Sequence, residues 1–223
     1  MSINVLIIGE SGTGKSTAIR TLPPEQTFLI NVINKPLPFR GSNKLYTKLS
    51  ADGLTGNYYA TDDHSTIMRL INMVNKKRPE IKYLVMDDAG YTLTNDFMRG
   101  ALQKGYEKFS ILARDFWEIM KTMNETRSDL LCFMLMHSDV DAQGKSKPKT
   151  IGKMLDEKVC IEGMFSCVLH SFLADGIYSF VTNNTGTLMA KSPMGLFDQQ
   201  IIPNDLFLVS EKINDYLNKD ISL

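Results

Sequence analysis

The sequence predicts an α/β fold in which helices flank a mostly parallel central sheet, with an antiparallel hairpin near the C-terminus. Three apolar runs support this class, at residues 4–8, 83–88 and 130–138. Each run ends in glycine or polar residues, as buried parallel strands do at their carboxyl ends. The 223 residues fit a single domain, 1–223, which is large enough to bury a core without disulfides.

A glycine-rich segment follows the first run. It reads Gly9-Glu10-Ser11-Gly12-Thr13-Gly14-Lys15-Ser16 and matches the phosphate-binding pattern G-x-x-x-x-G-K-[ST] at every fixed position. Thr17 begins a predicted helix that stops at Pro23-Pro24. A strand that passes through glycines into a helix points unpaired main-chain N–H groups at one spot, where they bind an anion.

Each residue type in this loop has a chemical reason. Gly9, Gly12 and Gly14 let the main chain wrap phosphates without a Cβ clash. The Lys15 ammonium can reach the β- and γ-phosphates, and the Ser16 hydroxyl can ligate Mg²⁺. We therefore expect residues 9–17 to bind ATP together with Mg²⁺.

The second apolar run ends in Asp87 and Asp88. Ligands bind at the carboxyl edge of open α/β sheets, so we expect Asp87 to hold Mg²⁺ beside Ser16, directly or through water. Asp88 has two interpretations: a base that positions the attacking water, or a helix cap or solvated loop acid.

The third run ends in His137 and Ser138, at the same predicted sheet edge. A polar side chain there can sense the γ-phosphate. The alternative for His137 is a loop histidine that bonds to a neighbouring main-chain group.

Helices and turns connect these strands. Residues 27–32 predict a second strand, followed by a long irregular segment to about Tyr58. Residues 62–78 predict a helix with an acidic N-cap and a basic end before Pro79. Residues 93–126 read as helical, and their apolar stripe favours a core face over a ligand site. That stripe contains Phe109, Leu112, Phe116, Ile119, Met120 and Met123.

The C-terminal third contains a polar, basic segment and then a hairpin. Residues 139–158 are either a basic loop that tracks a nucleic-acid backbone or an ordinary solvated loop. The residues that cluster in this segment are Gly144, Lys145, Lys147, Pro148, Lys149 and Lys153. Residues 168–173 and 177–182 predict adjacent strands around the turn Asp175-Gly176, and residues 205–216 a closing helix.

Composition and net charge exclude several classes of protein for this chain. With 25 Lys and Arg against 25 Asp and Glu and a pI near 6.8, the chain lacks a global basic field for nucleic acid or membrane. No apolar run approaches about 18 residues, and no signal peptide is recognised. The three cysteines, Cys132, Cys160 and Cys167, lack metal-site spacing, so we expect reduced thiols and a cytoplasmic protein, in the host cytoplasm if it comes from a phage.

The order of these features resembles the ATPase core of the RecA-like class: phosphate loop, acid-tipped strand, strand with a polar tip, basic loop, hairpin. More narrowly, the chain is similar to the small phage RecA-like ATPases associated with single-strand annealing proteins. The segments that carry the narrower likeness are Tyr178-x-Phe180-x-Thr182 and Ala190-Lys191-Ser192-Pro193.

The resemblance implies an ATPase that acts in DNA recombination, repair or replication, with single-stranded DNA, a single-strand annealing or binding protein and further copies of itself. Lys15 would contact the phosphates, His137 would be the phosphate sensor, and Asp88 would position the attacking water. Lys191 would act as a finger across a subunit interface, or is a surface lysine. Residues 31–35 lack the water-activating acid that RecA carries there, so either Asp88 does this work or hydrolysis is slow.

Two other functions share the phosphate loop. A small-molecule or nucleotide kinase would usually add an arginine-rich lid, and only Arg114 and Arg127 lie in the middle helical region. A non-enzymatic switch would bind ATP to change its assembly state with little hydrolysis, which the acid-free segment 31–35 favours.

Overall fold

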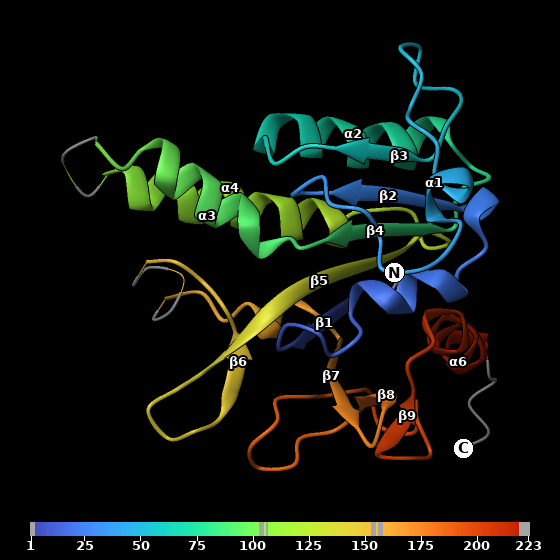
Figure 1. Ribbon diagram of the computed structural model, residues 1–223, viewed down its shortest axis with the longest axis vertical. Coiled ribbons are helices and arrows are strands. Elements are labelled where there is room, and N and C mark those ends of the chain that lie inside the picture. The colour runs from blue at the N-terminus through green and yellow to red at the C-terminus, as the bar shows by residue number, and fades with distance from the viewer. Residues whose placement is uncertain (1–2, 103–104, 106, 153–154, 156–157, 219–223) are drawn as a thin grey trace.

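The computed structural model describes residues 3–102, 105, 107–152, 155 and 158–218. A mixed, mostly parallel sheet lies between helical layers, which confirms the predicted α/β class (Figure 1). Its strands are β1 (Val5–Gly9), β2 (Thr27–Asn31), β3 (Tyr58–Ala60), β4 (Tyr83–Asp87), β5 (Leu131–Val140), β6 (Ser146–Pro148), β7 (Cys167–Ala174), β8 (Ile177–Val181) and β9 (Ile201–Pro203).

Helices of two kinds connect the strands. The α-helices are α1 (Ser42–Leu45), α2 (His64–Lys77), α3 (Gly90–Arg99), α4 (Glu107–Asn124) and α6 (Leu206–Asn218). The 3₁₀ helices are η1 (Ser16–Thr21), η2 (Pro24–Gln26) and η3 (Glu162–Met164).

The strands follow the order β3-β2-β4-β5-β1-β7-β8-β9, and β6 pairs with β5. Neighbours from β3 to β7 are parallel, whereas β8, β9 and β6 pair antiparallel. The register sets Gly9 opposite His137 and Asn31 opposite Asp87. The carboxyl ends of β1, β2, β4 and β5 therefore meet at one edge of the sheet, as the sequence predicted.

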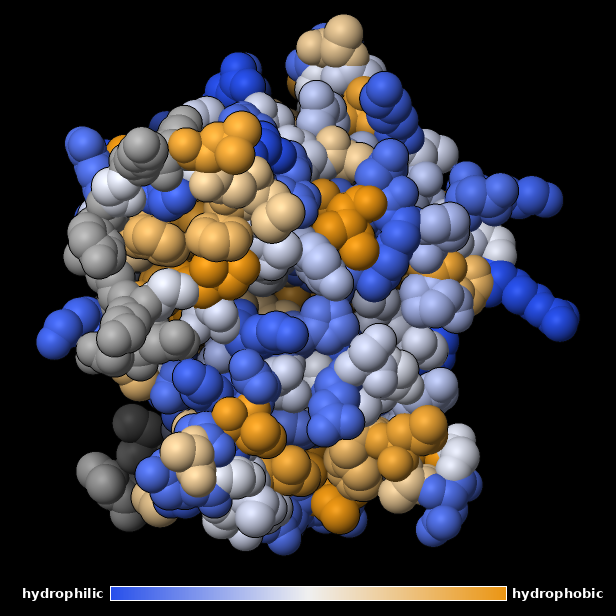
Figure 2. Space-filling view, turned by 60° about the vertical axis from the view of Figure 1, so that its left-hand side comes forward, coloured by the Kyte–Doolittle hydropathy of each residue, from blue (hydrophilic) through white to orange (hydrophobic). Residues whose placement is uncertain are grey.

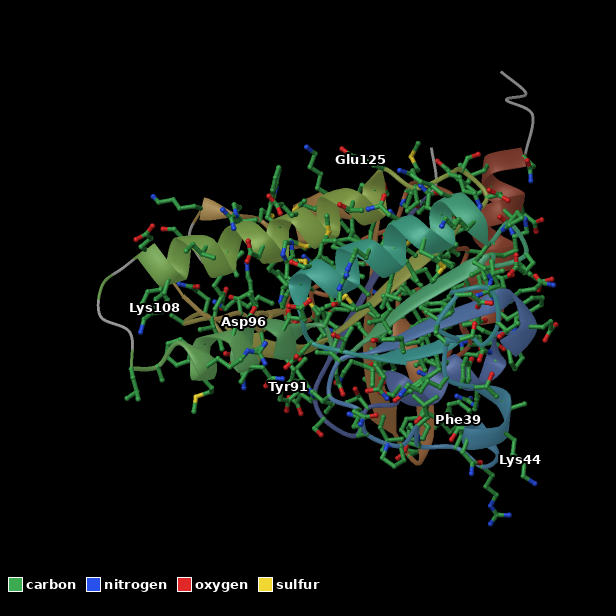
Figure 3. The ribbon with its side chains drawn as sticks, turned by 90° about the horizontal axis from the view of Figure 1, so that it is seen from above. Phe39, Lys44, Tyr91, Asp96, Lys108 and Glu125 are labelled. Atoms are coloured by element: carbon green, nitrogen blue, oxygen red, sulfur yellow. The ribbon has the colours of Figure 1, made fainter. Side chains whose placement is uncertain are left out.

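Alternate residues of the strands build two cores. On one face, residues such as Leu6, Ile8 and Met86 pack against α2, α3 and α4. On the other face, residues such as Ile7 and Val85 pack against η1 and α6. Figure 3 shows α2 and α4 side by side across the first face, with α3 next to α4.

The helix α2 has the ends that the sequence predicted. The side chain of Asp63 accepts a hydrogen bond from the N–H of Thr66, at 2.7 Å, and caps the first turn. Lys76 and Lys77 lie in the last turn, where the helix dipole favours cations.

The helical region 93–126 is two helices instead of one. Gly100 ends α3, with its N–H bonded to the carbonyl of Asp96, because glycine readily leaves the helical conformation. In α4, five members of the predicted stripe are buried in the core: Leu112, Phe116, Ile119, Met120 and Met123. The single tryptophan, Trp117, is exposed on this helix, with the Lys121 ammonium 5.3 Å from its ring centroid.

The basic segment 139–158 is not wholly a loop. Strand β5 continues to Val140 and forms a hairpin with β6, with Gly144 in the turn at a φ of 78°. The carboxylate of Asp141 accepts the N–H of Lys145 and closes this turn. Lys153 lies outside the described residues.

Candidate functional site

The predicted phosphate loop, residues 9–16, joins β1 to η1. Gly12 and Gly14 adopt φ values of 81° and 94°, which residues with a Cβ rarely adopt. Within the described part of the chain, no group accepts the main-chain N–H of residues 11–15. The loop is thus a row of unpaired donors, which suits an anion. The predicted helix after it is a 3₁₀ helix of six residues, so the loop's own N–H groups dominate this site.

The C-terminal hairpin presses on two of the glycines. A Cβ on Gly9 would lie 2.5 Å from the hydroxyl oxygen of Ser171, and a Cβ on Gly14 would lie 2.7 Å from the ring of Tyr178. The hydroxyls of Thr13 and Ser171 are 2.7 Å apart. Strands β7 and β8 therefore brace the loop, a role for Ser171 and Tyr178 that the sequence pattern did not reveal.

Lys15 is folded back onto its own loop. Its ammonium donates to the carbonyls of Gly9 and Glu10, at 2.8 and 2.7 Å, and the side chain is buried. Burial lowers the pKa of Lys15 to about 8, against the opposing charges of Asp88 and Asp87. Lys15 must exchange these carbonyls for phosphate oxygens when an anion fills the loop.

Ser16 and Asp87 form the pair expected of metal ligands. The Ser16 hydroxyl donates to Oδ1 of Asp87 at 2.8 Å, although the two residues come from η1 and β4. The second oxygen, Oδ2, is buried and accepts no hydrogen bond from the described residues. Burial raises the pKa of Asp87 to about 6, and the charge of Asp88 adds to that effect. A hydroxyl and a carboxylate with a spare buried oxygen fit Mg²⁺, which prefers oxygen ligands.

Asp88 is neither a cap nor a solvated acid. It is 2% exposed, and α3 has no side-chain cap. Its carboxylate forms an ion pair with Lys35 and lies 3.4 Å from Nε2 of His137. Burial alone would raise the pKa of Asp88, but hydrogen bonds from His137 and Lys35 outweigh burial and hold the pKa below its usual value. Asp88 is thus ionised, and its carboxylate already interacts with Lys35 and His137.

Lys35 is the main residue that sequence reasoning missed. It follows β2 across a short turn in which Asn34 has a φ of 52°. Because β2 lies beside β4, this turn brings the lysine to Asp88. The signal available in the sequence is a lysine just beyond the end of a predicted strand.

His137 lies between the ends of β1 and β4. It is opposite Gly9 in the register, and its ring meets that of Tyr91 edge to face, with centroids 5.9 Å apart. Its partner is a carboxylate, in contrast to the alternative of a loop histidine bonded to the main chain. A cavity of about 610 Å³ opens beside it, lined by Glu10, Ser11, Lys35, Tyr91, His137 and Lys149.

Lys191 is not part of this cluster within one chain. Its main chain exchanges hydrogen bonds with Val168, at 2.7 and 2.9 Å, two residues before His170. In the described structure its side chain forms no ion pair with Asp87 or Asp88. Thr17, by contrast, lies in η1 directly after Ser16, with its side chain partly exposed beside the loop.

Hydrophobic side chains gather at more than one place on the surface. Figure 2 shows hydrophilic side chains across the middle of the face in view and hydrophobic ones along its lower part. Exposed apolar residues of the β7–β9 end include Leu173, Ile177 and Ile201. No helix among the described residues has the length and apolarity needed to span a membrane. Neither the protein-family models nor the curated proteins provide a match to this chain, so its function is argued from the geometry of this site.

Proposed function

We propose that this protein is a Mg²⁺-dependent ATPase of the RecA-like class that acts on single-stranded DNA in phage-type recombination, repair or replication. The observation that carries the proposal is the 2.8 Å contact between Ser16 and Asp87, with the second Asp87 oxygen buried and unsatisfied. A buried carboxylate in that state is stabilised by a cation, and the adjacent row of free N–H groups is suited to the phosphates that accompany it.

The residues divide the work by position. The N–H groups of residues 11–15 bind the polyphosphate, and Lys15 turns from the Gly9 and Glu10 carbonyls to neutralise its charge. Ser16 and Asp87 are the residues that would hold Mg²⁺, and the ion would supply positive charge near the phosphoryl oxygens. Asp88 accepts a hydrogen bond from the attacking water, once Lys35 has moved from it to the phosphate.

In this proposal His137 is the phosphate sensor: its contacts with neighbouring residues change when phosphate binds. It is within 3.4 Å of Asp88 and packs against Tyr91 of α3. A change at the phosphates therefore reaches the base and the start of a helix through one side chain. Lys191 serves a neighbouring copy in this proposal, since its main chain pairs with Val168 and its side chain forms no ion pair with Asp87 or Asp88 in the described structure.

We assign the binding of single-stranded DNA to the hairpin formed by the end of β5 and by β6, which carries several lysines. Lys145, Lys147 and Lys149 lie on or beside β6, and Lys149 lines the cavity next to the phosphate loop. Figure 1 shows this hairpin extending away from the body of the sheet. Lysines in that position attract a phosphate backbone. The exposed apolar end formed by β7–β9 supports contacts between copies.

The experiment is phosphate release from ATP with and without single-stranded DNA at low salt. We expect Mg²⁺-dependent turnover that increases with DNA, is abolished in Lys15→Ala and is lost with binding retained in Asp88→Asn. If single-stranded DNA neither binds to the protein nor changes its turnover, the proposed role in DNA metabolism is wrong. A protein that does not bind ATP at all removes the whole proposal.

A second function, an ATP-dependent assembly switch with little hydrolysis, is favoured by the Lys35–Asp88 ion pair, because an engaged carboxylate is a poor base. Mass measurement with and without ATP, alongside phosphate release, separates the two. An increase in mass on addition of ATP, without phosphate release, would support the assembly switch over the ATPase.

A further inference from the structure

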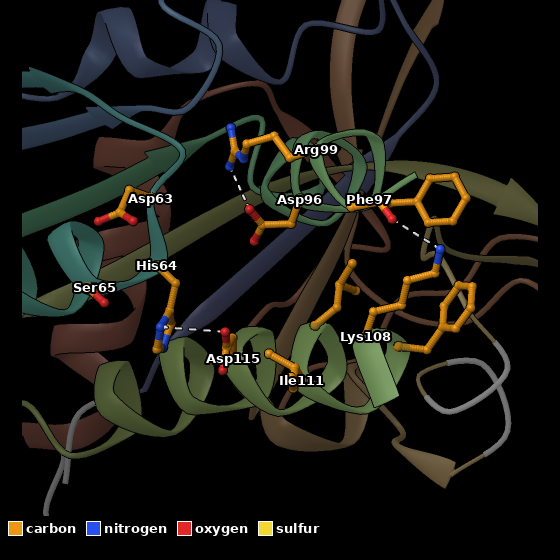
Figure 4. A pocket seen from close by; sticks show the side chains of 12 residues that line it. Asp63, His64, Ser65, Asp96, Phe97, Arg99, Lys108, Ile111 and Asp115 are labelled. Atoms are coloured by element: carbon orange, nitrogen blue, oxygen red, sulfur yellow. Dashed lines mark hydrogen bonds and ion pairs between the residues drawn. The ribbon is translucent and has the colours of Figure 1, made fainter. Parts of the chain in front are cut away.

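A second group of ligating side chains lies between α2 and α4. Nε2 of His64 is 3.3 Å from Oε2 of Glu118, and Nδ1 of His64 is 3.9 Å from Oδ2 of Asp115. One ligand atom from each residue lies within 4.8 Å of the other two. Figure 4 shows His64 reaching from α2 toward Asp115 on α4. Two helices from different parts of the chain thus bring one possible ligand atom from each of three side chains into a single small cluster.

The surroundings hold these side chains in place. Arg114 pairs with Oδ1 of Asp115 at 2.7 Å and lies 4.0 Å from Oε1 of Glu118. The other oxygen of each carboxylate is the one nearer His64. His64 is the first residue of α2, next to the N-cap Asp63, so its position is fixed by the capped turn.

The imidazole has an unmet bonding need. Its Nε2 atom is buried and makes no hydrogen bond with the described residues, although it lies 3.3 Å from Oε2 of Glu118. The three residues as a whole are partly exposed, at 20%, 19% and 39% for their side chains. His64 and Asp115 also line a cavity of about 330 Å³, which gives water access to the same point.

We propose that His64, Asp115 and Glu118 form a site for a zinc-class divalent transition metal that links α2 to α4. One imidazole and two carboxylates suit Zn²⁺, with water as the fourth ligand. Tetrahedral bonds to Zn²⁺ separate ligand atoms by about 3.4 Å, close to the His64–Glu118 distance. Mg²⁺, which prefers oxygen ligands in octahedral geometry, selects Ser16 and Asp87 instead.

The test is calorimetric titration of the full chain with Zn²⁺ in excess Mg²⁺, in a Cys160→Ser background that removes the exposed thiol. We expect one saturable site whose affinity falls at least 10-fold in His64→Ala and in Glu118→Gln. His137→Gln, which alters the phosphate-loop histidine, is the matched control and should retain the affinity. Zn²⁺ should raise the unfolding temperature of the parent and not of the two ligand variants.

Three results overturn the proposal: no saturable binding in the parent, unchanged affinity in both ligand variants, or loss of binding in His137→Gln. Thermal unfolding without metal checks that each variant folds. If His64→Ala does not fold, His64→Gln replaces it. Co²⁺ gives an independent readout, because nitrogen and oxygen ligands produce no thiolate charge-transfer band; such a band would place the ion on a cysteine and also overturn the proposal.

Discussion

The two carboxylate clusters of this protein differ in how they satisfy their charges. At the sheet edge, Asp87 and Asp88 are almost fully buried, and Asp87 keeps an oxygen without a partner. Between α2 and α4, Asp115 and Glu118 are partly exposed, and Arg114 is paired with the first and near the second. The buried cluster therefore leaves one carboxylate oxygen of Asp87 without a compensating partner among the described residues, whereas water moderates the charges of the exposed cluster.

The shifts in pKa follow the same division. Asp87 is pushed up to about 6 by burial, while its neighbour Asp88 is held below its usual pKa by the His137 and Lys35 hydrogen bonds that outweigh its own burial. Environments that push the pKa values of two adjacent acids apart are typical of sites that assign them separate roles. Here we assign metal binding to Asp87 and water orientation to Asp88.

The largest expected effect comes from Lys15→Ala. In the proposed ATPase the buried ammonium neutralises the phosphates, so its loss should reduce phosphate release by about 100-fold or more. The measurement is steady-state phosphate release with Mg²⁺. Turnover within a few fold of the parent would mean that the phosphates bind elsewhere in the protein. It would also remove the proposed difference in function between the two carboxylate clusters.

Gly14→Ala should have the next largest effect. Its φ of 94° and the Tyr178 ring 2.7 Å from the added Cβ together should lower the free energy of unfolding by about 2–3 kcal/mol. Gly144→Ala is the control: its φ is 78° and its Cβ would meet nothing within 4 Å, so we expect about 1 kcal/mol. Equal losses in denaturant unfolding would mean that the hairpin does not brace the loop.

Asp87→Asn should stabilise the metal-free protein. A carboxyl whose pKa is raised on folding binds more protons when folded, so its contribution to stability is present below the unfolded pKa and is lost as pH rises through about 6. At pH 7 the neutral amide should therefore raise the free energy of unfolding, on the order of 1 to 3 kcal/mol. Unfolding in a chelator from pH 4 to 7 measures this; a difference between variant and parent that does not change with pH argues against it.

Glu118→Gln should have the smallest effect. Its partners are partly exposed, so without metal the free energy of unfolding should change by less than about 0.5 kcal/mol. Chemical denaturation of both proteins in a chelator provides the comparison. A loss of several kcal/mol would show that this cluster, like Asp87, is under strong electrostatic constraint.

The sequence predicted the features that follow from local pattern and missed those that depend on contact between distant segments. The strands around the phosphate loop, Asp87 and His137 were found because apolar runs with polar tips identify parallel strand ends. Lys35 was missed because its approach to Asp88 depends on the neighbouring order of β2 and β4. The bracing by Tyr178 was missed because its partner lies 164 positions earlier, at Gly14.

One residue should give the cluster between α2 and α4 an optical signature that the cluster at the sheet edge lacks. Trp117 is the sole indole of the chain, precedes Glu118 on α4 and is open to solvent. Its emission should respond to an ion captured between α2 and α4 and remain constant when nucleotide fills the loop beside β1. The protein therefore carries an intrinsic fluorescent label by which occupancy of one cluster can be followed without disturbing the other.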